Sequence, residues 1–129
     1  MRVSLIRMAS ATIFALMGVA YGYVAGEAAL LAPLMTDWDQ YLTVDWQATQ
    51  KAGRTVVTGT VRSTSAWGAK RIQLLIDGLD PGGQVVTQRV EWLGSDLTPG
   101  SHAYFEVPVA EGASRYRVRV FAFDPIKRC

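Results

Sequence analysis

A run of nineteen residues without a charge, residues 8–26, is the feature that most limits what this chain can fold into. At about 1.5 Å of rise per residue, a helix of that length spans roughly the 30 Å hydrocarbon core of a bilayer. A segment in lipid must satisfy its own backbone hydrogen bonds, so such a run in a membrane is helical. The run predicts either a retained transmembrane helix or an export signal that is removed.

Both interpretations of this run have support. Arg2 and Arg7 form the positive N-terminal region of a signal, and small residues at 20–22 and 26–28 offer cleavage sites. Apolar residues continue to position 35 with only Glu27 interrupting, whereas the apolar core of a signal is about 7–15 residues long. We therefore favour a retained anchor and assign residues 1–35 to one transmembrane helix with a juxtamembrane extension. Cleavage stays the alternative.

The charges flanking the run predict its orientation. Arg2 and Arg7 precede it, and the next basic residue, Lys51, comes only after four acidic ones. Positive residues stay on the cytoplasmic side, so we expect a single-pass protein of the cytoplasmic (inner) membrane with its C-terminal domain in the periplasm or outside the cell. Trp38 lies just past the apolar region, where an aromatic ring favours the headgroup zone of the bilayer.

Three glycines at four-residue spacing lie within the run: Gly18, Gly22 and Gly26. Small residues at this spacing let helices approach closely in lipid. They predict packing against integral membrane proteins of a larger complex. The alternative is that the segment is rich in glycine and alanine for reasons unrelated to packing.

From residue 41 onward, apolar and polar residues alternate with the period of two that is typical of half-buried strands. We expect strands over residues 42–49, 54–62, 70–77, 84–93, 102–109 and 115–123. Between the third and fourth, residues 78–83 read GLDPGG, where Pro81 presets φ and Gly82 takes a positive φ in a type II turn. With no amphipathic helix between them, the six strands predict an antiparallel β-sandwich over residues 42–124. Residues 36–41 form a linker and 125–129 a tail, and Trp46 belongs to the core.

Composition narrows the class of partner. The chain has 13 basic and 11 acidic residues, and without Arg2 and Arg7 the remainder is neutral, 11 against 11. A neutral domain gives no electrostatic basis for binding nucleic acid. The single cysteine, Cys129, forms no internal disulfide, so packing alone must stabilise the exported domain.

The sequence contains no catalytic, cofactor-binding or metal-binding constellation, so we do not expect an enzyme. His102 is the only histidine and has no ligand or base at a suitable spacing, which favours a solvated residue at a strand end. Asp77, Asp80 and Asp96 have carboxylates of the kind that calcium binds, but their glycine- and proline-rich setting favours turn formation.

Two features are candidate protein interfaces. Arg115, Arg117 and Arg119 alternate along one strand face and form a basic stripe suited to an acidic partner. The alternative is a solvated face on which Glu91 and Glu106 pair with the stripe. Trp67 lies in a loop, where an exposed tryptophan is a common interface anchor; equally, its ring can fold back and close the end of the sandwich.

A series of strand and turn motifs runs through the predicted sandwich. A V-x-G-x-V strand is followed by a D-x-x-G-x-V-V turn, an L-x-P-G turn and an F-x-V strand. The residues at these motif positions are Val57, Gly59, Val61, Asp80, Gly83, Val85, Val86, Leu97, Pro99, Gly100, Phe105 and Val107. The series resembles the FxLYD-type domains of bacterial envelope proteins over about residues 44–123. The resemblance implies an immunoglobulin-like β-sandwich tethered outside the cytoplasmic membrane, with no assigned chemistry.

Two functions follow from these patterns. The first is a non-catalytic accessory subunit whose helix packs in a larger membrane complex of respiratory or photosynthetic type, while the exported sandwich contacts other proteins. The alternative is a secreted or tethered envelope module that binds a small ligand, glycan or peptide through loops near Trp67 and Trp92.

Overall fold

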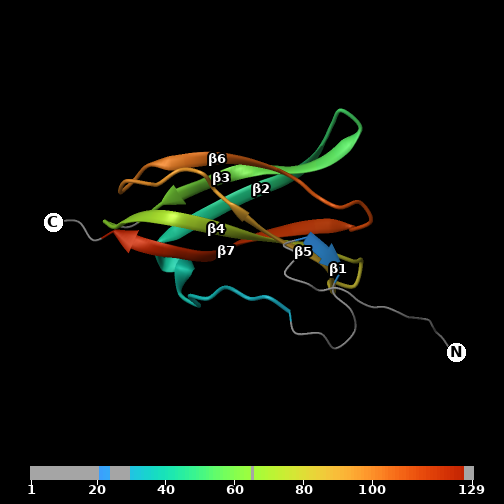
Figure 1. The fold of residues 1–129 in the computed structure, drawn as a ribbon, viewed down its shortest axis with the longest axis horizontal. Coiled ribbons are helices and arrows are strands. Elements are labelled where there is room, and N and C mark those ends of the chain that lie inside the picture. The colour runs from blue at the N-terminus through green and yellow to red at the C-terminus, as the bar shows by residue number, and fades with distance from the viewer. Residues whose placement is uncertain (1–20, 24–29, 65, 127–129) are drawn as a thin grey trace, which may run out of the picture.

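The computed structural model describes residues 21–23, 30–64 and 66–126, which form two antiparallel β-sheets (Figure 1). The larger sheet has the order β1-β5-β4-β7 and the smaller one the order β2-β3-β6. The strands are β1 (Tyr21–Tyr23), β2 (Leu42–Lys51), β3 (Arg54–Ser63), β4 (Gly68–Leu79), β5 (Val85–Trp92), β6 (His102–Pro108) and β7 (Arg115–Ile126), and a 3₁₀ turn, η2 (Trp38–Gln40), precedes β2. The mainly β, antiparallel fold predicted from the alternation is confirmed.

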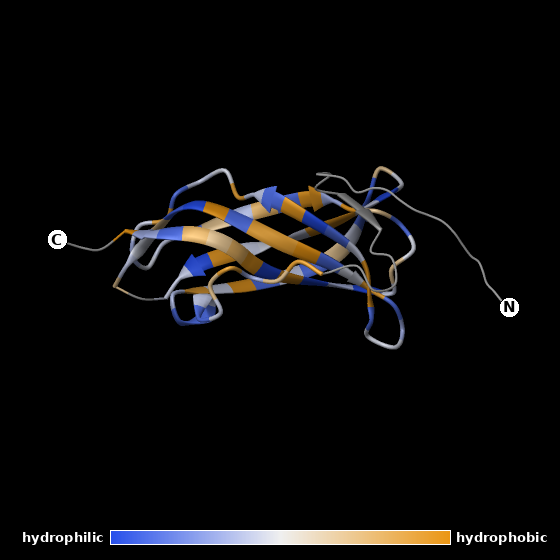
Figure 2. Ribbon diagram, turned by 60° about the horizontal axis from the view of Figure 1, so that its bottom comes forward, coloured by the Kyte–Doolittle hydropathy of each residue, from blue (hydrophilic) through white to orange (hydrophobic). Residues whose placement is uncertain are grey.

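The core lies between the two sheets. Every strand from β2 to β7, except β5, contributes a buried apolar side chain to one cluster, with Val57 and Phe105 from the smaller sheet facing Leu74 and Val118 from the larger. Figure 2 shows the alternation of apolar and polar residues along the strands that creates this inner face. Burial of apolar area of this kind is the main force that holds a domain without disulfides.

Gly59 brings β2, β3 and β6 close together at the centre of the smaller sheet. A methyl group at this position would clash with the carbonyl oxygen of Asp45 and lie 2.7 Å from Cζ of Phe105 and 2.9 Å from Cα of Trp46. The missing side chain therefore makes room for the Phe105 ring in the core.

Two local predictions need correction. In the turn between β4 and β5, Gly83 rather than Gly82 has the positive φ, at 87°, and its amide donates to the carbonyl of Asp80. Trp46 is not a core residue, because it is 39 % exposed. Its indole Nε1 donates a 2.9 Å hydrogen bond to the carbonyl of Tyr116, which joins the edge strands β2 and β7 of the two sheets.

The N-terminal part of the chain differs from the expected helix where it is described. Tyr21–Tyr23 is the strand β1, whose backbone pairs antiparallel with residues 87–89 of β5. The helix expected over residues 8–26 is wrong for these three residues; residues 8–20 and 24–26 lie outside the described part. Among the residues described, no helix has the length and apolar character needed to cross a bilayer.

Residues 30–35 form an extended segment, here called the strap, that lies against the larger sheet (Figure 1). The amide of Leu34 donates a 2.8 Å hydrogen bond to the carbonyl of Phe121 in β7. At its end, Met35 and then Trp38 and Tyr41 pack against the core. Residues 30–41, expected to be part of the anchor and the linker, are thus held on the sandwich.

Candidate functional sites

The larger sheet carries a buried charge cluster. Asp77 of β4 has no exposed surface and lies between Gln88 of β5 and Arg117 of β7 in the strand register. Its Oδ2 accepts hydrogen bonds from Arg117 Nε (3.0 Å) and Nη2 (2.7 Å) and from Arg119 Nη2 (2.7 Å). Two guanidinium groups around one carboxylate leave the cluster with a net charge of +1.

Gln88 connects this cluster to the strap. Its Nε2 donates to Asp77 Oδ1 at 2.9 Å and to the carbonyl of Leu31 at 3.0 Å, and its Oε1 accepts from the Leu31 amide at 3.0 Å. The side-chain amide thereby acts like a short stretch of strand backbone for the strap. Because buried polar groups are costly unless they are paired, this arrangement makes the cluster a structural clasp.

The basic stripe predicted on β7 is therefore divided. Arg117 and Arg119 bind Asp77, not the glutamates that the sequence offered as partners. Arg115 alone of the three is exposed, and the other two are half-buried. The alternation placed the three arginines on one face of the strand, but no pattern in the sequence indicated that Asp77 pairs with them or that the strap contacts the same cluster.

The two glutamates expected beside the stripe pair elsewhere. Glu91 Oε1 accepts a 3.0 Å bond from Arg89 Nε, and Glu106 Oε2 lies 2.8 Å from Lys51 Nζ. The hydrogen bond and the charge of Glu106 raise the pKa of Lys51 above its usual 10.5. Both pairs are partly solvated, and such pairs contribute little to stability.

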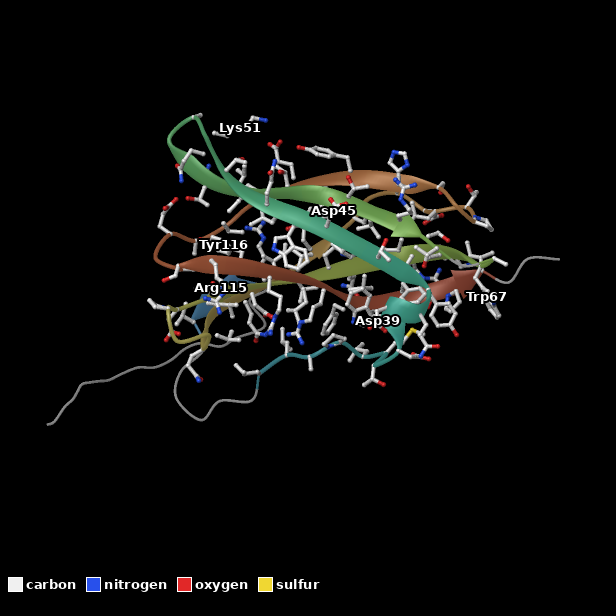
Figure 3. All side chains as sticks on the ribbon, turned by 180° about the vertical axis from the view of Figure 1, so that it is seen from behind. Asp39, Asp45, Lys51, Trp67, Arg115 and Tyr116 are labelled. Carbon is white, nitrogen blue, oxygen red and sulfur yellow. The ribbon has the colours of Figure 1, made fainter. Side chains whose placement is uncertain are left out.

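The two tryptophans predicted as contact residues, Trp67 and Trp38, are both half-buried. The ring of Trp67 lies edge-on to the ring of Tyr41, with 6.0 Å between the ring centroids. This contact favours the alternative in which the Trp67 ring folds back over the end of the sandwich. Trp38 packs against the core. Figure 3 shows Trp67 and Arg115 at opposite ends of the sandwich, so these candidates do not form one surface.

The turn acids and the histidine occupy separate places. Asp80 Oδ1 accepts the amide of Gln84 at 2.8 Å, as expected for a turn residue. His102 is exposed at the start of β6. No three metal-ligating side chains come together within the described residues.

Of the glycines proposed for helix packing, Gly22 lies in β1, opposite Gln88, while Gly18 and Gly26 are outside the described residues.

A groove at the end of β5 is the feature that sequence reasoning only partly anticipated. It encloses about 320 Å³ and is lined by Arg71, Ile72, Trp92, Gly94, Ser95 and Asp96. Trp92, the last residue of β5, is 57 % exposed, which is unusual for so large an apolar ring. The sequence indicated the loops near Trp92 but gave no signal for Arg71.

Arg71 faces this groove because of a bulge in β4. Lys70 pairs with Asp124 and Gln73 with Ala122, so three steps along β4 match two along β7. Bulges re-aim side chains, and Arg71 has a left-handed φ of 52°, which costs a non-glycine residue about 1–2 kcal/mol. Its guanidinium forms an ion pair with Asp124. Strain of this kind often marks a functional position.

Comparison of the chain with protein-family models, with curated proteins and with solved structures finds no match.

Proposed function

We propose that this chain is an exported, non-catalytic β-sandwich that acts as a binding module on the outer side of the cytoplasmic membrane. The observation that carries the proposal is the groove beside Trp92, where an exposed indole, an arginine at a strained φ and an exposed Asp96 line one hollow. Small-ligand sites combine apolar or aromatic surface with a few placed polar groups in this way.

The strand β1 supports export by a cleaved signal. If Tyr21–Tyr23 belongs to the sandwich, the uncharged run that precedes it comprises residues 8–20, which is thirteen residues. Thirteen residues are too few to span a bilayer but match the apolar core of a signal peptide. Gly18 and Ala20 are small residues at the two positions that a signal peptidase reads before Tyr21.

Fractionation of cells that make the native chain tests this proposal. We expect the protein in the soluble exported fraction after osmotic shock, without detergent. Recovery only in the membrane pellet after washing with alkaline carbonate would contradict export as a free module.

A second candidate function is the membrane-anchored accessory subunit, with its helix in a larger complex in the cytoplasmic membrane and the sandwich outside. The strap favours this second function, because its three leucines lie within five residues of one another and are exposed. The exposed fractions of Leu30, Leu31 and Leu34 are 49 %, 43 % and 69 %. Exposed apolar side chains that cluster are a common mark of a protein interface.

Co-purification in mild detergent tests this second function. We expect the subunit to be recovered with larger membrane proteins, and Leu34→Asp on the strap to reduce that recovery. Ile126→Asp is the matched control, because Ile126 is an apolar residue of similar class, 40 % exposed, away from the strap. Equal recovery of both variants, or migration of the native chain alone, would argue against the subunit.

The resemblance to FxLYD-type domains agrees with both functions, since it implies an immunoglobulin-like sandwich outside the membrane. Its key positions are central to the fold: Val57 and Phe105 lie in the core, and Gly59 gives the Phe105 ring its space. These positions support a shared architecture. They carry no argument about a ligand.

A further inference from the structure

We propose that the groove beside Trp92 binds a neutral carbohydrate, an inference that rests on the proposed binding function and adds the class of ligand. The groove consists of Arg71 and Ile72 of β4, Trp92 of β5 and the loop residues 94–96. We call it the Trp92 groove. Its volume of about 320 Å³ is at the lower end of the range for small-ligand sites.

The walls of the groove are fixed before any ligand arrives. The loop after β5 is tied to β4 at both ends: the Leu93 amide donates to the Ile72 carbonyl at 2.9 Å, and the amides and carbonyls of Leu97 and Ala69 exchange hydrogen bonds at 2.8 and 2.9 Å. Binding to a preorganised site loses less conformational entropy than binding to a mobile loop.

The exposed indole of Trp92 provides the apolar part of the site. A flat aromatic face can cover the C–H face of a pyranose ring, and its rigidity keeps the entropic cost of the contact low. The groove is also lined by three residues whose side chains donate or accept hydrogen bonds: Arg71, Ser95 and Asp96. A sugar ring offers hydroxyl groups that both donate and accept.

The charges of the groove favour a neutral ligand over an ionic one. The two charged residues that line the groove, Arg71 and Asp96, carry opposite charges, and Arg71 is already paired with Asp124, which disfavours an anion. A cation would approach Asp96 but would also meet the guanidinium of Arg71 in the same hollow. A polyol meets no like charge and can bond to both groups.

Titration of the exported chain with cellohexaose and with chitohexaose, both neutral, tests the inference. The readout is the indole N–H resonance of Trp92 in a ¹H–¹⁵N spectrum, assigned by its loss in Trp92→Phe. We expect a saturable shift with at least one of the two sugars and a Kd of about 1 mM, because only one ring face is covered.

Variants make the test specific to this surface. In the Trp92 variants binding is read from the backbone amide resonances of the groove residues 94–96 in the same spectrum, because the Trp92 indole is absent. We expect Trp92→Ala to weaken binding by about tenfold or more and Trp92→Tyr to retain most of it. Trp92 is exposed, so neither change should unfold the domain. Tyr104→Ala is the matched control, because Tyr104 is an aromatic residue, 63 % exposed, on the other sheet, and its loss should leave the Kd unchanged.

Three results would overturn the inference. One is no shift with either sugar at 50-fold the expected Kd, about 50 mM. Another is an equal loss of binding in Trp92→Ala and Tyr104→Ala. The third is a shift with tetramethylammonium or an oligogalacturonate but with neither neutral sugar, which would make the ligand ionic. None of these results bears on export. If the chain is soluble and exported but fails this titration, the binding-module proposal stands and only the assignment of a neutral carbohydrate is refuted.

Discussion

Replacing Asp77 by asparagine is the sharpest test of how this fold is held together. The change keeps the shape of the side chain and removes the one negative charge that faces Arg117 and Arg119. Asp77 is fully buried, and its Oδ2 accepts all three hydrogen bonds from the two guanidinium groups. An asparagine amide can accept with one atom only, so at least part of this set must break.

The magnitude follows from the burial of the partners. Removing one member of a buried ion pair typically costs about 3–5 kcal/mol, because a buried charge is left without compensation. Here the side chains of Arg117 and Arg119 are 39 % and 26 % exposed, so water can hydrate them in part. We therefore expect a loss of about 2–3 kcal/mol. In a domain of this size that corresponds to a fall in Tm of roughly 10 °C.

Urea unfolding followed by tryptophan fluorescence measures this loss as a change in midpoint at constant slope. Asp45→Asn is the matched control, because Asp45 is an exposed carboxylate on the smaller sheet, and its replacement should change stability by less than about 0.5 kcal/mol. If Asp77→Asn unfolds within about 0.5 kcal/mol of the control, the reasoning about the buried cluster is wrong.

Three further predictions concern the core, the strap and one titrating group. Gly59→Ala should lower the free energy of unfolding in urea by roughly 1–3 kcal/mol or more, since the new methyl group meets backbone atoms. Gly82→Ala is the control, because a methyl group has room there and should change stability little. Equal effects of the two changes would refute the close approach of the strands. Gln88→Ala should destabilise the domain by about 1–3 kcal/mol and speed amide exchange in the strap, and unchanged exchange there would refute the clasp. The pKa of the Lys51 ammonium, measured by NMR, should lie above 10.5 and should fall in Glu106→Gln. Because the folded-state pKa is raised, the small stabilisation from this pair is complete below pH 10.5 and is lost as the pH rises through the folded-state value. A midpoint at or below 10.5 in the native protein would contradict this prediction.

The alternation of residues was enough to predict six of the seven strands that the described residues form, and the core between the two sheets. Its success has a physical cause: Leu74 and Ile76 face inward at every second position, and no competing helical period is present. Proline and glycine chemistry predicted the turn after β4, although the glycine with positive φ is Gly83, one residue later than expected. Local rules locate turns well and their exact residues less well.

The remaining features depend on contacts between distant segments. β1 pairs with β5 across more than sixty residues of sequence, and the strap meets Gln88 at a separation of 57. Nothing near Tyr21 or Leu31 in the sequence signals these partners, and an apolar run is compatible with lipid, core or signal. No signal in the sequence indicated Arg71 either, because the bulge in which it lies depends on the register between β4 and β7.

The most direct test of the central claim, that Tyr21 begins an exported sandwich, is the N-terminal residue of the native protein determined by mass spectrometry. The proposal predicts a mature chain that begins at Tyr21, after the small residues Gly18 and Ala20, with β1 intact. A native chain that retains Met1 would contradict cleavage and would favour the anchored subunit.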